Sequence, residues 1–83
     1  MVTFTKPMFT LAEIIEAVED ELAEATDRYG PFHSTHEGYA VLKEEVDEMW
    51  DAIKQNDINH SRKEAVQVAA VAIRYLIDIK QRH

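Results

Sequence analysis

Apolar and polar residues alternate with a helical period along most of this chain. Across residues 11–29, apolar side chains recur at steps of three and four positions, which places them on one face of a helix. Thr10 precedes this run and Glu13 follows three positions later, the signature of an N-terminal capping box. Gly30 and Pro31 then break the pattern. These features predict a first amphipathic helix.

A second helical pattern covers residues 36–54, with Ser34 or Thr35 as its expected N-cap. Its apolar stripe consists of Tyr39, Leu42, Val46, Met49 and Ile53. We expect this stripe to face the core, because an amphipathic helix buries its apolar side. A polar connection over residues 54–59 follows the segment.

The third pattern, residues 60–82, is apolar around much of its circumference, and Asp57, Asn59 or Ser61 is its expected N-cap. Its apolar positions include Val66, Val68, Ala69, Ile73, Leu76, Ile77 and Ile79. A helix that is apolar on most sides must be covered on most sides, and two other short helices are too few for that. We therefore predict an all-α fold in which three-helix protomers form a homo-oligomer, a dimer or a tetramer. Helices of a second chain would complete a four-helix-type bundle.

Carboxylates crowd the second helical segment. The stretch "LKEEVDEMWDAI" contains Glu44, Glu45, Asp47, Glu48 and Asp51. At about 100° per residue, Glu44, Asp47 and Asp51 fall opposite the apolar stripe and are expected to face solvent. Glu45 and Glu48 instead project from a flank whose other residues are small or apolar. Two carboxylates near a core repel one another unless a cation lies between them, so this flank indicates a metal site.

The third segment carries one polar seam, formed by Glu64, Gln67, Val71, Arg74 and Asp78. A short connection favours antiparallel packing of the second and third helices, which brings Glu64 opposite Glu48. Three glutamates from two helices suit Mg²⁺, a hard cation that prefers oxygen ligands. Acidic pairs at this spacing are also common on solvated helices. Periodicity alone therefore predicts an all-α bundle with a candidate carboxylate site.

Composition restricts the partners of the chain. Its 83 residues carry 9 Lys and Arg against 16 Asp and Glu, a formal net charge of −7, which argues against binding a nucleic-acid polymer. There is no cysteine, so a disulfide framework is excluded. No apolar run approaches a membrane span, and the N-terminus lacks the regions of a signal peptide. We expect one cytoplasmic domain, residues 1–83, without membrane contact.

The two acidic segments together resemble a known family. "LKEEVDEMWDAI", followed by "KEAVQVAAVAIRYLIDI", is similar to the MazG-like all-α nucleoside triphosphate pyrophosphohydrolases, in particular to their compact, phage-type branch. In that family an EExxE motif on one helix and an ExxD motif on the next hold Mg²⁺. Here Glu44, Glu45 and Glu48 complete the first motif, and Glu64 begins the second. The resemblance covers residues 11–79, most of the chain.

The chain departs from the family pattern at two points. Gln67 stands where the ExxD motif has aspartate, so this position offers an amide without charge and leaves the number of bound ions open. Family members also commonly have a fourth helix after the motif helix, whereas this sequence ends at His83. The second departure favours a neighbouring subunit that completes the site.

The resemblance implies hydrolysis of a (deoxy)nucleoside triphosphate between the α- and β-phosphates, which yields a nucleoside monophosphate and pyrophosphate. Mg²⁺, with Mn²⁺ as a substitute, would be held by Glu45, Glu48, Glu64 and Gln67 and would offset the charge of the phosphates. Glu44 or Glu45 would accept the proton of the attacking water.

Cations for the phosphates are expected on the same helices. Arg74 is the first candidate because it shares the polar seam with Glu64, and Lys43, Arg62 and Lys63 are alternatives. Arg74 could instead form an ion pair with Asp78, four positions further along its own helix.

The nucleotide base would lie between the first two helices. Candidate contacts are Phe32, His36, Tyr39 and Trp50, which can stack on a base, and Glu16 and Asp20, which can accept hydrogen bonds. Tyr39 lies on the apolar stripe and is expected in the core rather than against a ligand, and Trp50 could serve a subunit interface. His60 and Glu64 could share a metal, but the ExxH pairs of di-iron bundles are missing.

Two other hypotheses remain. A MazG-like module could bind nucleotide or a protein partner without turnover, which the neutral Gln67 favours. A plain helical assembly protein could carry an acidic face that is only solvated. An enzyme binds Mg²⁺ and releases pyrophosphate, a binding module binds nucleotide and releases nothing, and a plain bundle does neither.

Overall fold

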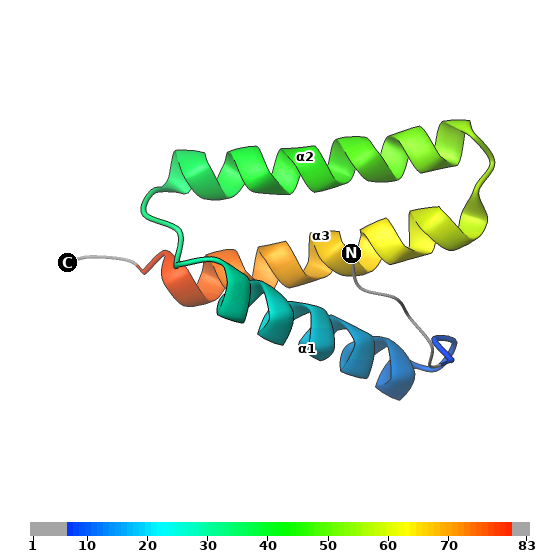
Figure 1. Ribbon diagram of the computed structural model, residues 1–83, viewed down its shortest axis with the longest axis horizontal. Helices are drawn as coiled ribbons and strands as arrows, with labels where there is room; N and C mark the ends of the chain where they lie inside the picture. Colours follow the sequence, from blue (N-terminus) through cyan, green and yellow to red (C-terminus); the bar gives the residue numbers. More distant parts are fainter. Residues whose placement is uncertain (1–6, 81–83) are drawn as a thin grey trace.

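A computed structural model describes residues 7–80, and within that range it contains three helices and no strand. The helices are α1 (Leu11–Arg28), α2 (Thr35–Lys54) and α3 (Ile58–Asp78). α2 and α3 lie side by side and antiparallel, and α1 packs on another side of α3 (Figure 1). The backbones of α1 and α2 both contact α3 and do not approach one another. The predicted all-α fold with three helices is confirmed.

Side-chain caps define the start of every helix. The Thr10 hydroxyl accepts a hydrogen bond from the Glu13 amide (3.2 Å), and the Glu13 carboxylate accepts one from the Thr10 amide (2.9 Å), which completes the predicted capping box. Ser34 caps α2 and Asp57 caps α3, each by accepting from the amide three positions later at 3.0 Å. Of the alternatives that the sequence left open, Ser34 and Asp57 are therefore the N-caps.

The turn between α2 and α3 is short and sets their antiparallel arrangement. It spans residues 55–57, and Asn56 adopts a left-handed conformation with φ of 58°, which asparagine tolerates better than most residues. At its other end α3 stops at Asp78, so the predicted extension to residue 82 is too long. Residues 79 and 80 lie outside the helix, and residues 81 and 82 lie outside the described part of the chain.

The core forms mainly between α1 and α3. Val18, Val66 and Ala70 are buried at its centre. Met8, Ile14, Ala17, Leu22 and Ala69 pack around them. This small core matches the predicted apolar face of the first helix over its middle turns. The two ends of that stripe, Leu11 and Tyr29, are exposed.

The prediction that the apolar stripe of α2 faces the core is correct only in part, because Leu42 and Met49 are half-buried and the other three members are not. Tyr39 is 63% exposed, and Val46 and Ile53 are also exposed. The most buried residues of α2 are the small Gly38 and Ala52, and the half-buried Leu42 and Met49 lie on the same side of the helix. The reason is steric, because small residues let two helix backbones approach more closely than a row of large side chains does.

Large apolar side chains therefore remain uncovered on α2 and α3. We call them the outer apolar surface, which consists of Tyr39, Val46, Trp50, Ile53, Ile73, Leu76 and Ile77. The exposure of Ile73, Leu76 and Ile77 agrees with the expectation that two other helices are too few to bury all apolar sides of α3. None of the described helices combines the length and the apolar character that crossing a bilayer demands.

The connection between α1 and α2 is held against the C-terminal half of α3. Arg74 donates a hydrogen bond to the Gly30 carbonyl (2.6 Å), and Asp78 accepts one from the Phe32 amide (2.9 Å). The Arg74 guanidinium also lies over the Phe32 ring, 4.1 Å from its centroid, and Phe32 is buried. These contacts place the start of α2 and thereby its register along α3.

Gly38 marks a close approach of α2 to α3. A Cβ built on Gly38 would lie 2.5 Å from Cδ2 of the Tyr75 ring. We predict that Gly38→Ala lowers the free energy of unfolding by about 1–2 kcal/mol, because overpacking outweighs the gain in helix propensity. Urea denaturation measures the change.

Gly30→Ala is the matched control for this prediction, since a Cβ there meets nothing within 4 Å. We expect its free energy of unfolding to stay within about 0.5 kcal/mol of the wild type. Equal losses in the two variants, or a stabilised Gly38→Ala protein, would contradict the packing account.

Candidate metal centre

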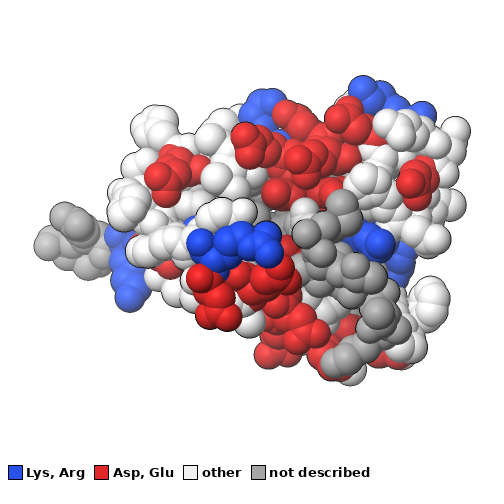
Figure 2. Space-filling view, viewed as in Figure 1, with Lys and Arg blue, Asp and Glu red and all other residues white. Residues whose placement is uncertain are grey.

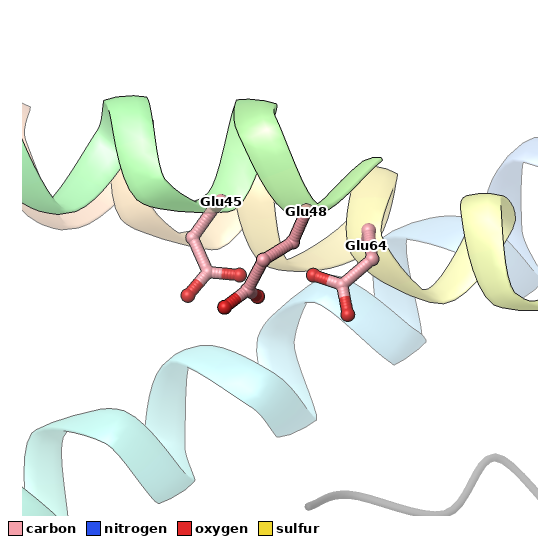
Figure 3. Close-up of side chains that lie close together, drawn as sticks. All are labelled: Glu45, Glu48 and Glu64. Carbon is pink, nitrogen blue, oxygen red and sulfur yellow. The ribbon is translucent and has the colours of Figure 1, made fainter. Parts of the chain in front are cut away.

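Three glutamates from two helices bring their carboxylates together. Glu45 and Glu48 extend from α2, and Glu64 extends from α3 to the same region (Figure 3). One oxygen of each carboxylate lies within 4.8 Å of the other two. Glu64 is only 5% exposed, Glu45 is half-buried, and Glu48 is open to solvent. The cluster therefore has a buried base and an open side.

The local structure explains why these residues meet. Glu45 and Glu48 are three positions apart, so they point from the same side of α2. The short turn makes α3 run back along α2, which places Glu64 beside Glu48 as the sequence predicts. Glu45 and the small residues Gly38 and Ala52 share the flank that faces α3, so the carboxylates approach closely without a bulky neighbour between them.

The size and chemistry of the cluster fit a magnesium ion. Mg²⁺ binds oxygen ligands at 2.0–2.1 Å in an octahedron, so opposite ligands lie about 4 Å apart. Adjacent ligands of such an octahedron lie about 3 Å apart, so the three oxygens, which lie within 4.8 Å of one another, would draw closer together around the ion. The open side at Glu48 leaves room for water or phosphate oxygens to complete the octahedron.

Crowding changes the protonation of the cluster. Burial, followed by a hydrogen bond with Glu64 and repulsion from Glu48, raises the pKa of Glu45 to about 8. Burial and repulsion from Glu64 also raise the pKa of Glu48. Near neutral pH the cluster thus retains a proton, which occupies the role that a divalent cation would otherwise take.

Gln67 and His60 flank Glu64 on α3. In the amide orientation that satisfies both neighbours, the Gln67 nitrogen donates to Oε2 of Glu64 (3.1 Å) and to Oε2 of Glu45 (2.6 Å). Rotation of the amide by about 180° would instead present its oxygen to a cation. The His60 ring approaches the other oxygen of Glu64, with 3.1 Å between Nε2 and Oε1. Gln67 therefore lies beside Glu45 and Glu64, and its role as a ligand stays a prediction.

α1 contributes a carboxylate that the sequence analysis did not select. Oε2 of Glu21 is buried and has no hydrogen-bond partner within the described residues, and burial followed by repulsion from Glu24 raises the pKa of Glu21. Glu16 and Asp20, which were selected, are exposed. The overlooked signal is position, because Glu21 follows Val18 by three residues and therefore lies near the apolar stripe.

Two cavities adjoin Glu45. The first, about 170 Å³, opens between α1 and α2 and is lined by Glu21, Glu24, Arg28, Tyr29, Glu45, Gln67 and Arg74 among others. The second, about 450 Å³, lies under the connection from α1 to α2 and includes Tyr29, Phe32, His33, Glu37, Glu44, Glu45 and Arg74. Arg74 lines both cavities, so its buried guanidinium forms part of a common wall.

Of the cations predicted to contact the phosphates, Arg74 lies near the cluster, whereas Lys43 and Arg62 have partners elsewhere. The Arg74 guanidinium already bonds the Gly30 carbonyl and lies 3.7 Å from Asp78, the predicted intrahelical partner. Lys43 bonds Asp47 on the exposed side of α2 (2.8 Å). Arg62 donates to the Met8 carbonyl at the start of the described chain.

Of the residues predicted to contact the nucleotide base, only some line a cavity beside Glu45. Phe32 lines the larger cavity, whereas His36, Tyr39 and Trp50 are exposed and line neither cavity beside Glu45. The expectation that Tyr39 lies in the core is wrong for the single chain, because its side of α2 faces away from α3. Glu44, the other candidate proton acceptor, is exposed at the larger cavity.

The surroundings of the cluster are strongly acidic. Figure 2 shows acidic side chains gathered over the middle of α2 and along α1. Arg28, the other cation of the smaller cavity, forms an ion pair with Glu24 (2.6 Å). An anionic ligand would therefore need a divalent cation to offset the surrounding charge.

Comparisons of the chain with protein-family models, with curated proteins and with solved structures give no match. The site must therefore be interpreted from its own geometry. Its main features are three converging carboxylates, a raised pKa at Glu45 and two adjoining cavities.

The raised pKa of Glu45 predicts a specific pH dependence of stability. Between about pH 4.5 and about pH 8, the folded protein retains a proton on Glu45 that the unfolded chain releases. Without divalent metal, Glu45 should therefore lower the free energy of unfolding as pH rises through that window. Above about pH 8 its contribution should stay constant. We predict that Glu45→Gln gains thermal stability relative to the wild type as pH rises from about 5 to about 8.

Thermal unfolding in the presence of a chelator measures this effect across the pH range. Asp47→Asn is the matched control, because Asp47 is exposed and lies outside the cluster. Its melting temperature should follow the wild-type pH profile. Parallel profiles for wild type and Glu45→Gln would show that Glu45 does not retain a proton in the folded state.

Proposed function

We propose that this protein is a MazG-like, Mg²⁺-dependent nucleoside triphosphate pyrophosphohydrolase. The observation that carries the proposal is the convergence of Glu45, Glu48 and Glu64 on one point. These residues come from two helices and correspond to both motifs of the family. The second-motif residue, Glu64, is the most buried of the three carboxylates. Burial of this kind is not expected for an acidic face that is only solvated.

The positions of the carboxylates support the reaction that the resemblance implies. When bound, Mg²⁺ would offset the negative charge of the phosphates and the charge that develops during hydrolysis. Glu48 and Glu64 hold the ion together with Glu45, and Gln67 orients the carboxylates or turns its own oxygen inward. A water molecule attacks, the bond between the α- and β-phosphates breaks, and pyrophosphate leaves.

Glu45 and Glu44 are the two candidates for accepting the proton of the attacking water. Glu45 lies inside the cluster, and a bound divalent cation would offset the repulsion that keeps it protonated in the metal-free protein, so that it could accept a proton. Glu44 is exposed at the edge of the larger cavity. We assign the proton to Glu45, because it is the closer of the two to the point where the phosphates would bind.

The two cavities beside Glu45 offer space for the nucleotide. The larger one contains aromatic side chains, including Tyr29 and the buried Phe32, against which a base can stack. Arg74 forms part of both walls and supplies positive charge between base and phosphates, in addition to its bond with the Gly30 carbonyl. Arg28 at the mouth of the smaller cavity is a further cation.

The outer apolar surface supports a homo-oligomer, a dimer or a tetramer. Tyr39 and Trp50 belong to this surface, so we assign them to the subunit interface rather than to the nucleotide. Helices of a second chain would cover the exposed stripe of α2 and complete a four-helix-type bundle. We place the protein in the cytoplasm, where nucleoside triphosphates and Mg²⁺ are available.

Pyrophosphate release tests the proposal directly. We predict Mg²⁺-dependent release from at least one member of a panel of ribo- and deoxynucleoside triphosphates. Glu48→Gln should lower kcat/KM at least about 100-fold, since removing one charged ligand weakens both metal binding and charge stabilisation. Asp47→Asn, one position away on the outside of α2, is the matched control and should retain activity.

Absence of release across the panel, from folded protein, would contradict the proposed enzyme. Nucleotide binding without release would then favour the MazG-like binding module, the alternative function. Equal activity of Glu48→Gln and wild type would show that hydrolysis, if present, does not depend on the glutamate cluster.

The neutral Gln67 gives a second prediction. Gln67→Asp adds a fourth carboxylate beside Glu45 and Glu64, which strengthens attraction for a divalent cation and increases repulsion without one. We predict Mn²⁺ binding at least about tenfold tighter by calorimetry, together with a lower melting temperature in chelator.

Gln67→Asn is the control, because it has the size of aspartate without the charge. It should not tighten Mn²⁺ binding. A Gln67→Asp protein with unchanged affinity and unchanged melting temperature would place residue 67 outside the metal site.

A further inference from the structure

Glu64 is a buried carboxylate whose two oxygens each have a neighbour from its own helix. Gln67, three positions later, donates to Oε2 on the side facing Glu45. His60, four positions earlier, approaches Oε1 at 3.1 Å. The side chain of Glu64 is therefore held between two polar groups along α3, and a buried glutamate without such partners would sample several rotamers.

The His60 ring is itself fixed at the start of α3. The His60 amide donates to Oδ1 of Asp57, the N-cap (3.0 Å), and the ring nitrogen Nδ1 lies 3.9 Å from Oδ2 of Asp57. Since an ionised Glu64 can only accept, the interaction requires hydrogen on Nε2 of His60. The ring thus lies between the N-cap and the buried carboxylate, and its hydrogen bond is to Glu64.

His60 stands outside the group of oxygens that would bind the cation. That group consists of Glu45, Glu48 and Glu64, whose carboxylate oxygens lie mutually close. The ring lines a cavity of about 310 Å³ near the turn, and Glu48 and Glu64 of the cluster line the same cavity. Its contact with the site passes through Oε1 of Glu64.

We propose that His60 is a positioning residue that orients Glu64 for metal binding. The Nε2–H of His60 holds Oε1, so that Oε2 faces Glu45 and the ion. This inference rests on the proposed function to the extent that it treats Glu64 as a metal ligand. Polar partners of ligating carboxylates commonly have this role, and their loss weakens metal affinity without removing a ligand.

Mn²⁺ binding by calorimetry tests the proposal. We expect His60→Ala to weaken Mn²⁺ binding about 10- to 100-fold, the usual effect of losing an outer partner of a metal ligand. His60→Gln should restore most of the affinity, because its amide nitrogen can occupy the position of Nε2 and donate to Glu64. The cap is preserved in both variants, since the His60 amide supplies that bond.

Asn59→Ala is the matched control, an exposed position in the same first turn of α3. It should bind Mn²⁺ as the wild type does. Wild-type affinity in His60→Ala, or no recovery in His60→Gln when both variants show the wild-type helical circular dichroism, would overturn the proposal.

Pulsed electron paramagnetic resonance of the bound Mn²⁺ separates positioning from direct ligation. A positioning role predicts no strongly coupled nitrogen in the wild-type spectrum. A directly bound imidazole nitrogen that disappears in His60→Ala would overturn the proposal, because His60 would then be a ligand itself.

The same experiments separate this inference from the proposed function. If the wild type binds no Mn²⁺, the metal site and the role of His60 fail together. If it binds Mn²⁺ with the expected dependence on His60 but releases no pyrophosphate, only the hydrolytic function fails. If it releases pyrophosphate and His60→Ala binds Mn²⁺ normally, only the role of His60 fails.

Discussion

The close packing of α2 on α3 is the contact on which the rest of the structure depends. Gly38 and Ala52 remove bulk from the facing side of α2, and the turn at residues 55–57 makes the two helices antiparallel. This arrangement brings Glu45 and Glu48 against Glu64. It also turns the large apolar side chains of α2 outward, where a second subunit can cover them. The packing of α2 on α3 thus creates both the carboxylate cluster and the outer apolar surface.

The approach of the helices has an electrostatic cost, because carboxylates are brought together as they lose water. The cluster can offset this cost with a proton, as the raised pKa of Glu45 indicates, with polar donors such as Gln67, or with a cation. Only a divalent cation compensates several negative charges at once. Folding thus gathers three carboxylates that the separate helices keep apart, and this convergence is the physical basis of the proposed function.

Much of this could be predicted from the sequence, since helices, caps and the Glu48–Glu64 pair depend on local spacing and on one short turn. The orientation of α2 could not, because periodicity ranks large apolar residues above glycine and alanine, whereas close packing favours the small ones. The hydrogen bond from Arg74 to the Gly30 carbonyl joins residues that are far apart in the chain, so local sequence patterns do not predict it. The place of Glu21 near the apolar stripe of α1 could have been predicted from its spacing to Val18, whereas the burial of its Oε2 is known only from the fold.

Anomalous diffraction from crystals grown with Mn²⁺ would test the central claim most directly, because it locates the ion without any assumption about activity. The account predicts a peak at the meeting point of Glu45, Glu48 and Glu64, with carboxylate oxygens about 2 Å away. The imidazole of His60 should lie beyond Glu64 and make no contact with the ion. Crystals that bind Mn²⁺ only elsewhere, or a cluster that stays protonated and metal-free at saturating Mn²⁺, would contradict it.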